Sequence, residues 1–303
     1  CDEMTTVKVP ATSANVGAGF DALGLAVDLY NTVRFELADS LSISSTDGTK
    51  IPQGSDNLVY RAAADTFAFC GRPVPGMHIT QTNPIPMARG LGSSSACIVA
   101  GILGANALMG GPLSPRQMLT LATNIEGHPD NVAPALLGGF VASVLDEGQV
   151  YSVKKDISEQ LAFAAFIPDF PLLTRKARAV LPQNVPFKDA VYNLSRAALA
   201  TAAFCDGDYE LLGVATKDAL HQSYRLPLVP GGEDVFRLAR ELGALGVYIS
   251  GAGPTIMAVV RRSDEAFFAS AESRLQLAKI QGQPLGAFCV KHLLAANGGA
   301  VVE

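Results

Sequence analysis

The sequence predicts an α+β fold divided between two domains. Segments with the two-residue alternation of half-buried strands are mixed with helical segments, and the two kinds do not alternate strictly along the chain. A length of 303 residues indicates about two domains or one large one. Because polarity rises at Asp146-Glu147-Gly148, we expect an N-terminal domain over residues 1–150 and a C-terminal domain over residues 151–303.

Local patterns predict the first elements of the N-terminal half. Alternating apolar and polar residues favour strands at residues 7–9 and 25–37. Asp56 is expected to cap a helix that Gly71 ends. Prolines bound a further strand over residues 75–86.

Two helices complete this half. Residues 94–109 carry almost no polar side chain, so we expect this helix to be buried. The second begins at Ser114-Pro115, an N-cap residue followed by the proline that a first helical turn accepts. Its core-facing residues are expected to be Met118, Leu121, Ala122 and Ile125.

The C-terminal half combines the same two kinds of element. Strands are expected at residues 161–169, around 249–260 as a pair, and at 286–291. Helices are expected within residues 189–204, 208–220, 231–246 and 263–279.

The composition excludes several classes of protein. A formal net charge of −5 argues against a general nucleic-acid-binding protein. The five cysteines are scattered and form no CxxC pair, which predicts reduced thiols rather than a disulfide framework or a zinc site. No apolar run approaches the length of a membrane span, and the N-terminus has no signal-peptide pattern. We therefore expect a cytoplasmic protein that binds neither nucleic acid nor a membrane.

The segment NPIPMARGLGSSSACIVAG, residues 83–101, places a glycine-rich turn before an apolar helix. Glycine lets the backbone approach an anion, and the N–H groups and dipole of the first helical turn favour negative charge. Ser93, Ser94 and Ser95 add hydroxyls for phosphate oxygens or a metal ion. The segment has neither the lysine of GxxxxGK[ST] nor a GxGxxG pattern. It predicts a phosphate site neutralised by Mg²⁺; the alternative is a capped turn on a core helix.

A carboxylate at the end of the second helix points to the same site. Glu126 lies in the last turn before Gly127, where the helix dipole disfavours it by a few tenths to about one kcal/mol. Glutamate, serine, phosphate and water oxygens are ligands that Mg²⁺ accepts. The alternative is a solvated surface glutamate. Taken alone, His128 would be a packed or capping residue and Asp130-Asn131 a turn.

The SGAGPT segment, residues 250–255, joins two apolar strands. Its glycines predict a tight turn. The same small residues would also let this turn pack against the phosphate loop, backbone against backbone.

Five segments resemble one known family of enzymes: PATSANVGAGFDALGLAV, PMARGLGSSSA, EGHPDNVAPALLGG, TRKARAVLP and SGAGPT. They follow the expected order over nearly the whole chain and are similar to the GHMP small-molecule kinase superfamily, and within it to the homoserine kinase family. The resemblance implies a two-domain α+β GHMP kinase fold. The N-terminal domain would be ribosomal-protein-S5-like and the C-terminal domain ferredoxin-like.

The resemblance also implies an activity. A member would transfer the γ-phosphate of ATP to the side-chain hydroxyl of L-homoserine, giving O-phospho-L-homoserine in threonine biosynthesis. ATP and Mg²⁺ would be required, and members are commonly homodimers.

Site residues follow from the same resemblance. Asn57 would belong to the adenine pocket, and Ser94, one of three serines, would ligate Mg²⁺ with Glu126. The phosphates would lie against Pro86, Met87, Ala88, Arg89, Gly90, Leu91, Gly92, Ser93, Ser94, Ser95 and Ala96. Homoserine would be held by Asn15, Asp21, His128, Asn131, Arg178 and Arg225.

Charge sorts the residues on the acceptor side. The guanidinium groups of Arg178 and Arg225 suit a carboxylate, and Asp21 suits an ammonium group. Asn131 and Asn15 can orient the hydroxyl and the amino acid. No general base is evident, and phosphoryl transfer depends mainly on positioning and charge stabilisation. We expect Mg²⁺, the loop amides and Asn131 to contribute most to catalysis. The second choice is a mechanism in which Asp21 acts as a base.

Other interpretations stay open at this point. A sister kinase would phosphorylate mevalonate, shikimate or another acceptor, although two arginines and an aspartate favour an amino acid. A non-catalytic regulator that binds a nucleotide or an amino acid could share the fold, although the presence of both Ser94 and Glu126 favours catalysis. A purely structural protein would leave Glu126 and the glycine-serine loop unexplained.

Overall fold

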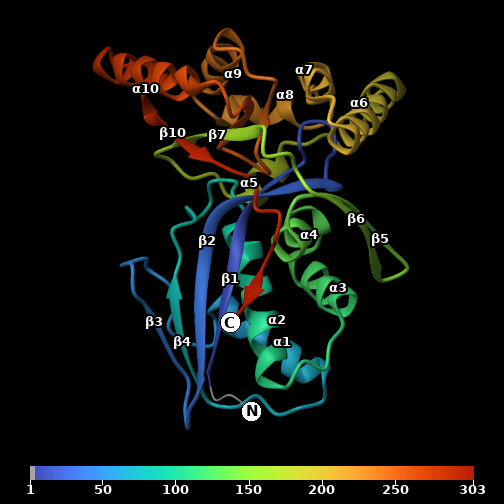
Figure 1. Cartoon of the computed structure of the whole chain (residues 1–303), viewed down its shortest axis with the longest axis vertical. Helices are drawn as coiled ribbons and strands as arrows, with labels where there is room; N and C mark the ends of the chain where they lie inside the picture. Colours follow the sequence, from blue (N-terminus) through green and yellow to red (C-terminus); the bar gives the residue numbers. More distant parts are fainter. Residues whose placement is uncertain (1–3) are drawn as a thin grey trace.

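The chain folds around two β-sheets, one in each half of the molecule (Figure 1). The computed structural model describes residues 4–303. The larger sheet has seven strands and the smaller has four, and helices pack against both. The predicted α+β fold is therefore confirmed.

The larger sheet contains the first six strands and the last one. Its main path runs β11 (Val301–Val302), β1 (Met4–Ala14), β2 (Leu23–Leu37), β4 (Met77–Thr82), β3 (Ser42–Ser45). A hairpin of β5 (Phe140–Asp146) and β6 (Gln149–Lys155) continues it, because β5 also pairs with β2. The strands predicted at residues 7–9 and 25–37 are confirmed as parts of β1 and β2.

Four helices cover one side of this sheet: α1 (Leu58–Phe69), α2 (Ser93–Leu108), α3 (Pro115–Glu126) and α4 (Pro129–Leu137) (Figure 1). As predicted, α2 is buried along most of its length. The predicted start of α3 is also confirmed, since Ser114 and Gln117 form a reciprocal capping box there.

The smaller sheet has the order β10 (Phe288–Leu293), β7 (Leu161–Pro168), β9 (Ile256–Arg261), β8 (Gly246–Ile249). Every residue of β7 is buried. One face of this strand packs against α9 (Gly232–Glu241) and α10 (Glu265–Ile280). The other face joins the hydrophobic core of the larger sheet. The two halves therefore meet through packed side chains, which fixes the loops between them.

The predicted domain boundary at residue 150 falls within a strand of the larger sheet. That residue lies in β6, and Asp146-Glu147-Gly148 forms the turn of the β5–β6 hairpin within the larger sheet. The C-terminal end of the chain also returns to the larger sheet, where β11 pairs with β1 (Figure 1). The rise in polarity marks an exposed hairpin turn, which has the same composition as a linker.

Three local predictions were wrong. Asn57, and not Asp56, caps α1, because its Oδ1 accepts from the N–H groups of Val59 and Tyr60. Residues 208–220 form only a 3₁₀ turn (Tyr209–Leu211) and the short α7 (Leu212–Ala215). The Asp130-Asn131 pair lies in the first turn of α4 and not in a loop turn.

The remaining helices connect β7 to β8: α5 (Thr174–Ala179), α6 (Phe187–Asp206) and α8 (Gln222–Arg225). Among the described residues, no helix is long and apolar enough to cross a membrane. The thiols predicted to be reduced are free in the described chain, namely Cys70, Cys97, Cys205 and Cys289, and Cys1 lies outside the described residues.

Candidate active site

A pocket of about 250 Å³ lies between the start of α2 and the loops of the smaller-sheet half. It gathers residues from distant parts of the sequence. Those predicted for the site that line it are Asn15, Asp21, Pro86, Ala88, Arg89, Gly90, Leu91, Gly92, Ser93, Ser94, Ser95, Glu126, His128, Asn131, Arg178 and Arg225. Residues predicted to bind the phosphates and residues predicted to bind the acceptor therefore share one cavity.

The loop before α2 is shaped to receive an anion. Ala88, Gly90 and Gly92 have left-handed backbone conformations, with φ of 53°, 78° and 70°. Such alternation directs successive N–H groups to one side, which makes a concave anion-binding surface. Gly92 is the N-cap of α2 and brings no capping side chain, so no side chain of this residue occupies the first N–H groups of α2, which could bind an anion.

The SGAGPT turn fastens this loop, as its composition suggested. Ser250 Oγ donates to Gly90 O over 2.6 Å, and Thr255 N donates to Arg89 O over 3.1 Å. A Cβ on Gly90 would lie 2.3 Å from Ser250 O, so only glycine fits between the two backbones. The main chain of the loop is thus held in shape by hydrogen bonds from Ser250 and Thr255 in the other half of the molecule.

Arg89 has a structural role in this loop. Its Nε donates to Pro168 O over 3.0 Å, and its Nη atoms donate to Met87 O and Asp169 O, each over 3.1 Å. The guanidinium group therefore ties the loop to the end of β7.

Oxygen donors for a divalent cation meet beside the phosphate loop. Ser94 Oγ donates to Glu126 Oε2 over 3.1 Å, linking the first turn of α2 to the last turn of α3. Ser93 is already bound by Asn83, whose Nδ2 donates to its hydroxyl over 3.2 Å. Ser95 Oγ is buried and has no hydrogen-bond partner in the described chain. Hard oxygen ligands are those that Mg²⁺ prefers, so Ser94 with Glu126 fits this ion.

On the acceptor side, Asp21 and Arg178 form a two-point ion pair. Arg178 Nη2 donates to Asp21 Oδ1 over 2.7 Å, and its Nη1 donates to Oδ2 over 3.1 Å. The hydrogen bonds and charge of Asp21 raise the pKa of Arg178, so the guanidinium stays protonated. Asn15 shapes the Asp21 turn, since its Oδ1 accepts from Asp21 N over 3.0 Å.

His128 and Asn131 begin α4 and border the same pocket. His128 Nδ1 pairs with the buried carboxylate of Asp130. Burial lowers the pKa of His128, but the hydrogen bond and charge of Asp130 outweigh it, and the pKa is raised. Asn131 Oδ1 accepts from Thr12 Oγ1 over 2.8 Å, which leaves the Nδ2 group as the donor for a ligand.

Arg225 is the last residue of α8, lines the pocket and is only 1% exposed. Its Nε donates to Ala177 O over 3.1 Å and its Nη1 to Gly251 O over 3.2 Å. Burial, followed by the charge of Arg178, lowers its pKa to about 10, so it is still a cation at neutral pH. A second fixed positive charge therefore stands near Arg178.

Three of the predicted ATP contacts do not line this pocket. Asn57 is 2% exposed; its Oδ1 caps α1 and its Nδ2 donates to Pro52 O over 2.9 Å. Ala96 is buried in the core. Met87 is exposed outside the cavity lining.

Sequence reasoning missed other residues of the lining, among them Asp130, Leu173, Thr174, Gly251 and Ala252. Asp130 has a signal in the sequence, as an acidic residue two positions after His128. The local pattern of Asp130-Asn131, however, predicts a turn. Leu173 and Thr174 carry no chemical signal, because only the fold brings them to the pocket.

The fold and the pocket define a small-molecule kinase of the GHMP class. The GHMP kinase N-terminal domain model matches residues 57–139, and the GHMP kinase C-terminal model matches residues 200–274. Full-length relatives narrow the class further. The chain belongs to the homoserine kinase family of the GHMP kinases.

The similarity to these relatives extends along the chain. A homoserine kinase of Clostridium beijerinckii is 46% identical, covering 99% of this chain and 98% of the relative. One of Moorella thermoacetica is 50% identical over 85% of this chain and 88% of the relative. The crystal structure of homoserine kinase from Cytophaga hutchinsonii matches with a TM-score of 0.87 at 29% identity. The match covers 100% of this chain and 98% of that one. A mevalonate kinase structure, at 14% identity and a TM-score of 0.68, shares the fold alone.

Proposed function

We propose that this chain phosphorylates the side-chain hydroxyl of L-homoserine with ATP, giving O-phospho-L-homoserine for threonine biosynthesis. The observation that carries the proposal is the Asp21–Arg178 pair beside the phosphate loop. A zwitterionic amino acid can bind between these two side chains, with its ammonium group on Asp21 and its carboxylate on Arg178, in place of their contact with each other. The free thiols favour a reducing compartment, and we place the reaction in the cytoplasm.

The triphosphate of ATP would lie against the first N–H groups of α2 and the left-handed loop that precedes it. Ser94 and Glu126 would hold Mg²⁺, which when bound supplies charge neutralisation for the phosphates. The fixed loop amides stabilise charge without reorganising during transfer. ATP binding here thus relies on backbone geometry where other kinases place a lysine.

The acceptor hydroxyl would be directed by Asn131. Thr12 occupies the Oδ1 atom of Asn131, so its Nδ2 donates to the hydroxyl oxygen and leaves the O–H proton free. The oxygen attacks the γ-phosphorus as the bond to the β-phosphate oxygen breaks, and the proton leaves late to phosphate or solvent. Both oxygens of Asp21 are engaged by Arg178, which favours a binding role over that of a base.

An acceptor screen tests this function. ADP release is measured with homoserine, serine, threonine and mevalonate side by side. We expect kcat/KM for homoserine to exceed the values for the other three compounds by about 100-fold or more. Each of those compounds lacks a charged group or places its hydroxyl elsewhere. Preference for mevalonate, or ATP turnover that does not depend on homoserine, would refute the proposal.

Asp21→Asn is expected to raise KM for homoserine roughly 10- to 100-fold and to change kcat far less. The substitution removes the charge that holds the ammonium group, and such charge-assisted hydrogen bonds are worth about 1.5–3 kcal/mol. Steady-state kinetics over a wide homoserine range measure both constants, with the exposed Asp146→Asn as the control. If turnover stays several orders of magnitude low at saturating homoserine, Asp21 acts as the base.

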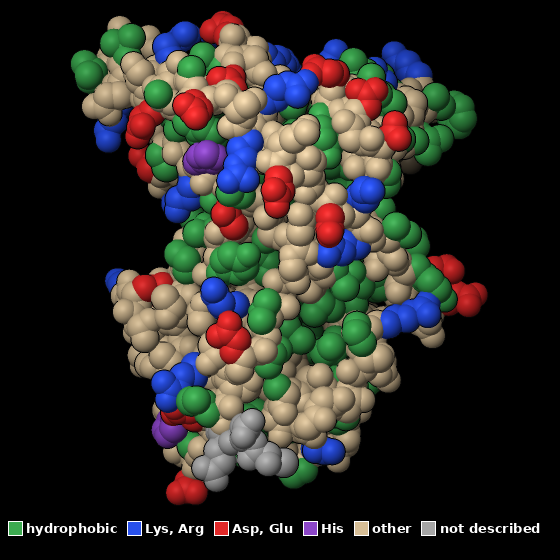
Figure 2. Space-filling model, viewed as in Figure 1, with side chains coloured by type: hydrophobic (Ala, Val, Ile, Leu, Met, Phe, Trp, Pro, Cys, Tyr) green, Lys and Arg blue, Asp and Glu red, His purple; other side chains and the backbone are tan. Residues whose placement is uncertain are grey.

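We also propose a homodimer that forms through α6. Three large apolar side chains project from this helix at helical spacing: Phe187, Val191 and Leu194, which are 84%, 48% and 71% exposed. Ala198, Ala202 and Cys205 continue the stripe toward the end of the helix and are exposed as well. Figure 2 shows hydrophobic side chains at this outer edge of the molecule, at the upper right.

The stripe is complementary to itself about a two-fold axis. In an antiparallel pair of α6 helices, the large residues in the first half of one helix face the small residues in the second half of the other helix. The same arrangement brings Lys188 opposite Asp206 of the second copy, since both flank the stripe on one side. Size and charge therefore favour a second copy of this chain as the occupant.

Leu194→Glu is expected to turn the dimer into a monomer, since a charge would be buried at the centre of the contact. Ile280→Glu is the matched control, because Ile280 is also exposed, by 74%, but lies at the end of α10. Light scattering after size exclusion measures the mass. A monomeric parent protein, or a Leu194→Glu variant that stays dimeric, would rule out this interface.

A further inference from the structure

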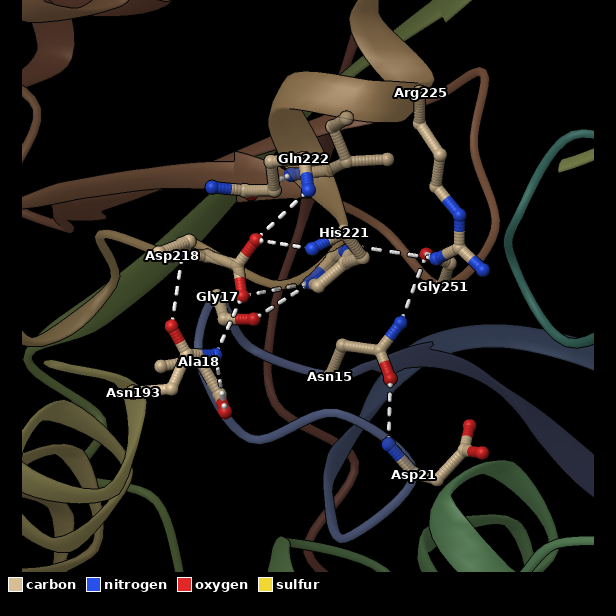
Figure 3. A network of polar contacts seen from close by, with 12 residues as sticks. Asn15, Gly17, Ala18, Asp21, Asn193, Asp218, His221, Gln222, Arg225 and Gly251 are labelled. Atoms are coloured by element: carbon tan, nitrogen blue, oxygen red, sulfur yellow. Dashed lines mark hydrogen bonds and ion pairs between the residues drawn. The ribbon is translucent and has the colours of Figure 1, made fainter. Parts of the chain in front are cut away.

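A buried polar network behind the acceptor site is not used in the chemistry described so far (Figure 3). It centres on Asp218 and His221, in the segment between α7 and α8, whose side chains are both 0% exposed. A charged or polar group buried so completely is costly unless its partners are specific. Each polar atom of this pair has such a partner, which permits its protonation state to be read from geometry.

His221 is neutral and carries its proton on Nε2. Its Nε2 lies 2.7 Å from Gly17 O, a carbonyl that can only accept, so this nitrogen must donate. Its Nδ1 lies 3.2 Å from Arg225 Nη1, a group that can only donate, so this nitrogen must accept. Burial lowers the pKa of His221, and the Arg225 charge lowers it further although Asp218 opposes both, which agrees with the neutral ring.

Asp218 holds the histidine in place. Its Oδ2 accepts from the N–H groups of His221 and Gln222, over 2.8 and 2.7 Å, and so begins α8. Its Oδ1 accepts from Asn193 Nδ2 over 2.7 Å. Asn193 Nδ2 also reaches Ala18 O over 3.3 Å. The position of the imidazole ring is therefore set from both α6 and α8.

The network closes on the two groups proposed to hold homoserine. Gly251 O accepts from Arg225 and also from Asn15 Nδ2, over 2.9 Å, while Asn15 Oδ1 fixes the N–H of Asp21. Figure 3 shows Asn15, Asp21, His221 and Arg225 arranged around this point. One imidazole thus contacts both the arginine at the pocket and the turn that presents Asp21.

We propose that neutral His221 is a positioning residue for homoserine: its Nδ1 aims the Arg225 guanidinium at the substrate carboxylate while its Nε2–H fixes the Asp21 turn. The inference rests on the proposed function, because Arg225 and Asp21 are the expected contacts of the amino acid. His221 touches neither substrate nor nucleotide. Its effect is on the binding of the acceptor.

Protonation of the ring would undo this arrangement. The charged groups that face His221 are Asp218, Arg225 and, farther away, Asp21, and the Phe20 ring packs against it with centroids 5.3 Å apart. An added proton would remove the acceptor of Arg225 and place two cations in contact. Homoserine binding should therefore weaken as pH falls below the ordinary histidine range.

Two variants at position 221 test the proposal. His221→Leu removes both contacts, and His221→Asn keeps an oxygen near the position of Nδ1 that accepts from Arg225 but cannot titrate. We expect His221→Leu to raise KM for homoserine roughly 10- to 100-fold while KM for ATP changes less than about 3-fold. His221→Asn should recover most of this loss, and His292→Asn, outside the pocket, is the control.

The pH profile gives a readout that a purely structural role would not move. In the parent protein, kcat/KM for homoserine should fall on the acid side, and in His221→Asn this limb should flatten. Equal rises in both KM values, or an unchanged acid limb in His221→Asn, would overturn the proposal. Since the profile uses the conservative variant, the test stands if His221→Leu fails to fold. A parent protein inactive with homoserine would instead refute the proposed function.

Discussion

Glu126→Gln is expected to lower kcat about 100- to 1000-fold while leaving the fold intact. The substitution keeps the shape and one oxygen of the side chain but removes the charge that, with Ser94, would hold Mg²⁺. Because Glu126 ends α3 at the negative end of its dipole, the neutral variant should be as stable as the parent or more stable, by up to about 1 kcal/mol. An inactive but stabilised protein is a combination that damage to the fold does not produce.

Steady-state kinetics with a Mg²⁺ titration and a denaturant melt measure both effects. The Mg²⁺ concentration for half-maximal rate should rise in Glu126→Gln. Glu272→Gln, on the exposed side of α10, is the control and should behave as the parent. A Glu126→Gln variant that retains more than about a third of the parent rate would show that this carboxylate does not hold the ion.

Gly90→Ala is expected to destabilise the protein by about 3 kcal/mol or more and to remove most ATP-dependent activity. Its Cβ would meet Ser250 O at 2.3 Å and Gly253 O at 2.9 Å, both in the backbone of the turn that fastens the phosphate loop. A left-handed backbone conformation adds about 1–2 kcal/mol for any residue with a Cβ. The two costs together should force the loop away from the turn.

Gly110→Ala separates these two costs. Gly110 has φ of 84°, close to the 78° of Gly90, but a Cβ there meets nothing within 4 Å. This variant should lose only the conformational part and should keep its KM for ATP. Urea unfolding and ATP kinetics on both variants give the comparison. Equal losses would mean that the contact with Ser250 does not shape the phosphate site.

The phosphate loop could be predicted because its chemistry is contiguous in the sequence. Gly90, Gly92 and the serines that follow lie within a few residues of one another, and the helix they precede has a strong apolar signal. Glu126 was detectable for a different reason, since a carboxylate at that end of a helix conflicts with the dipole. Local physics was sufficient for both.

The acceptor side depends on contacts that no local pattern contains. Asp21 and Arg178 are 157 positions apart, and Gly17 and His221 are 204 apart. The resemblance to a family supplied the residue types, but the pairing of Asp21 with Arg178 and the role of His221 follow only from the folded chain. Asp218 gave no signal at all, because a buried aspartate and a solvated one look identical in a sequence.

Two differences between the sequence patterns and the structure have the same physical origin. Asp56 and Asn57 are both good capping residues, and burial of Asn57 against Pro52 decides between them. The polar turn at residues 146–148 has the composition of a linker, and only the pairing of β5 with β6 shows that it is a hairpin. Tertiary contacts choose among local alternatives of nearly equal free energy.

A structure with a non-hydrolysable ATP analogue, Mg²⁺ and homoserine tests the central idea most directly. The triphosphate should rest on the main-chain nitrogens at the start of α2, with the ion touching Ser94 and Glu126 and the amino acid between Asp21 and Arg178. A nucleotide bound with its phosphates away from Gly90–Ser95, or an ion that contacts neither Ser94 nor Glu126, would contradict it.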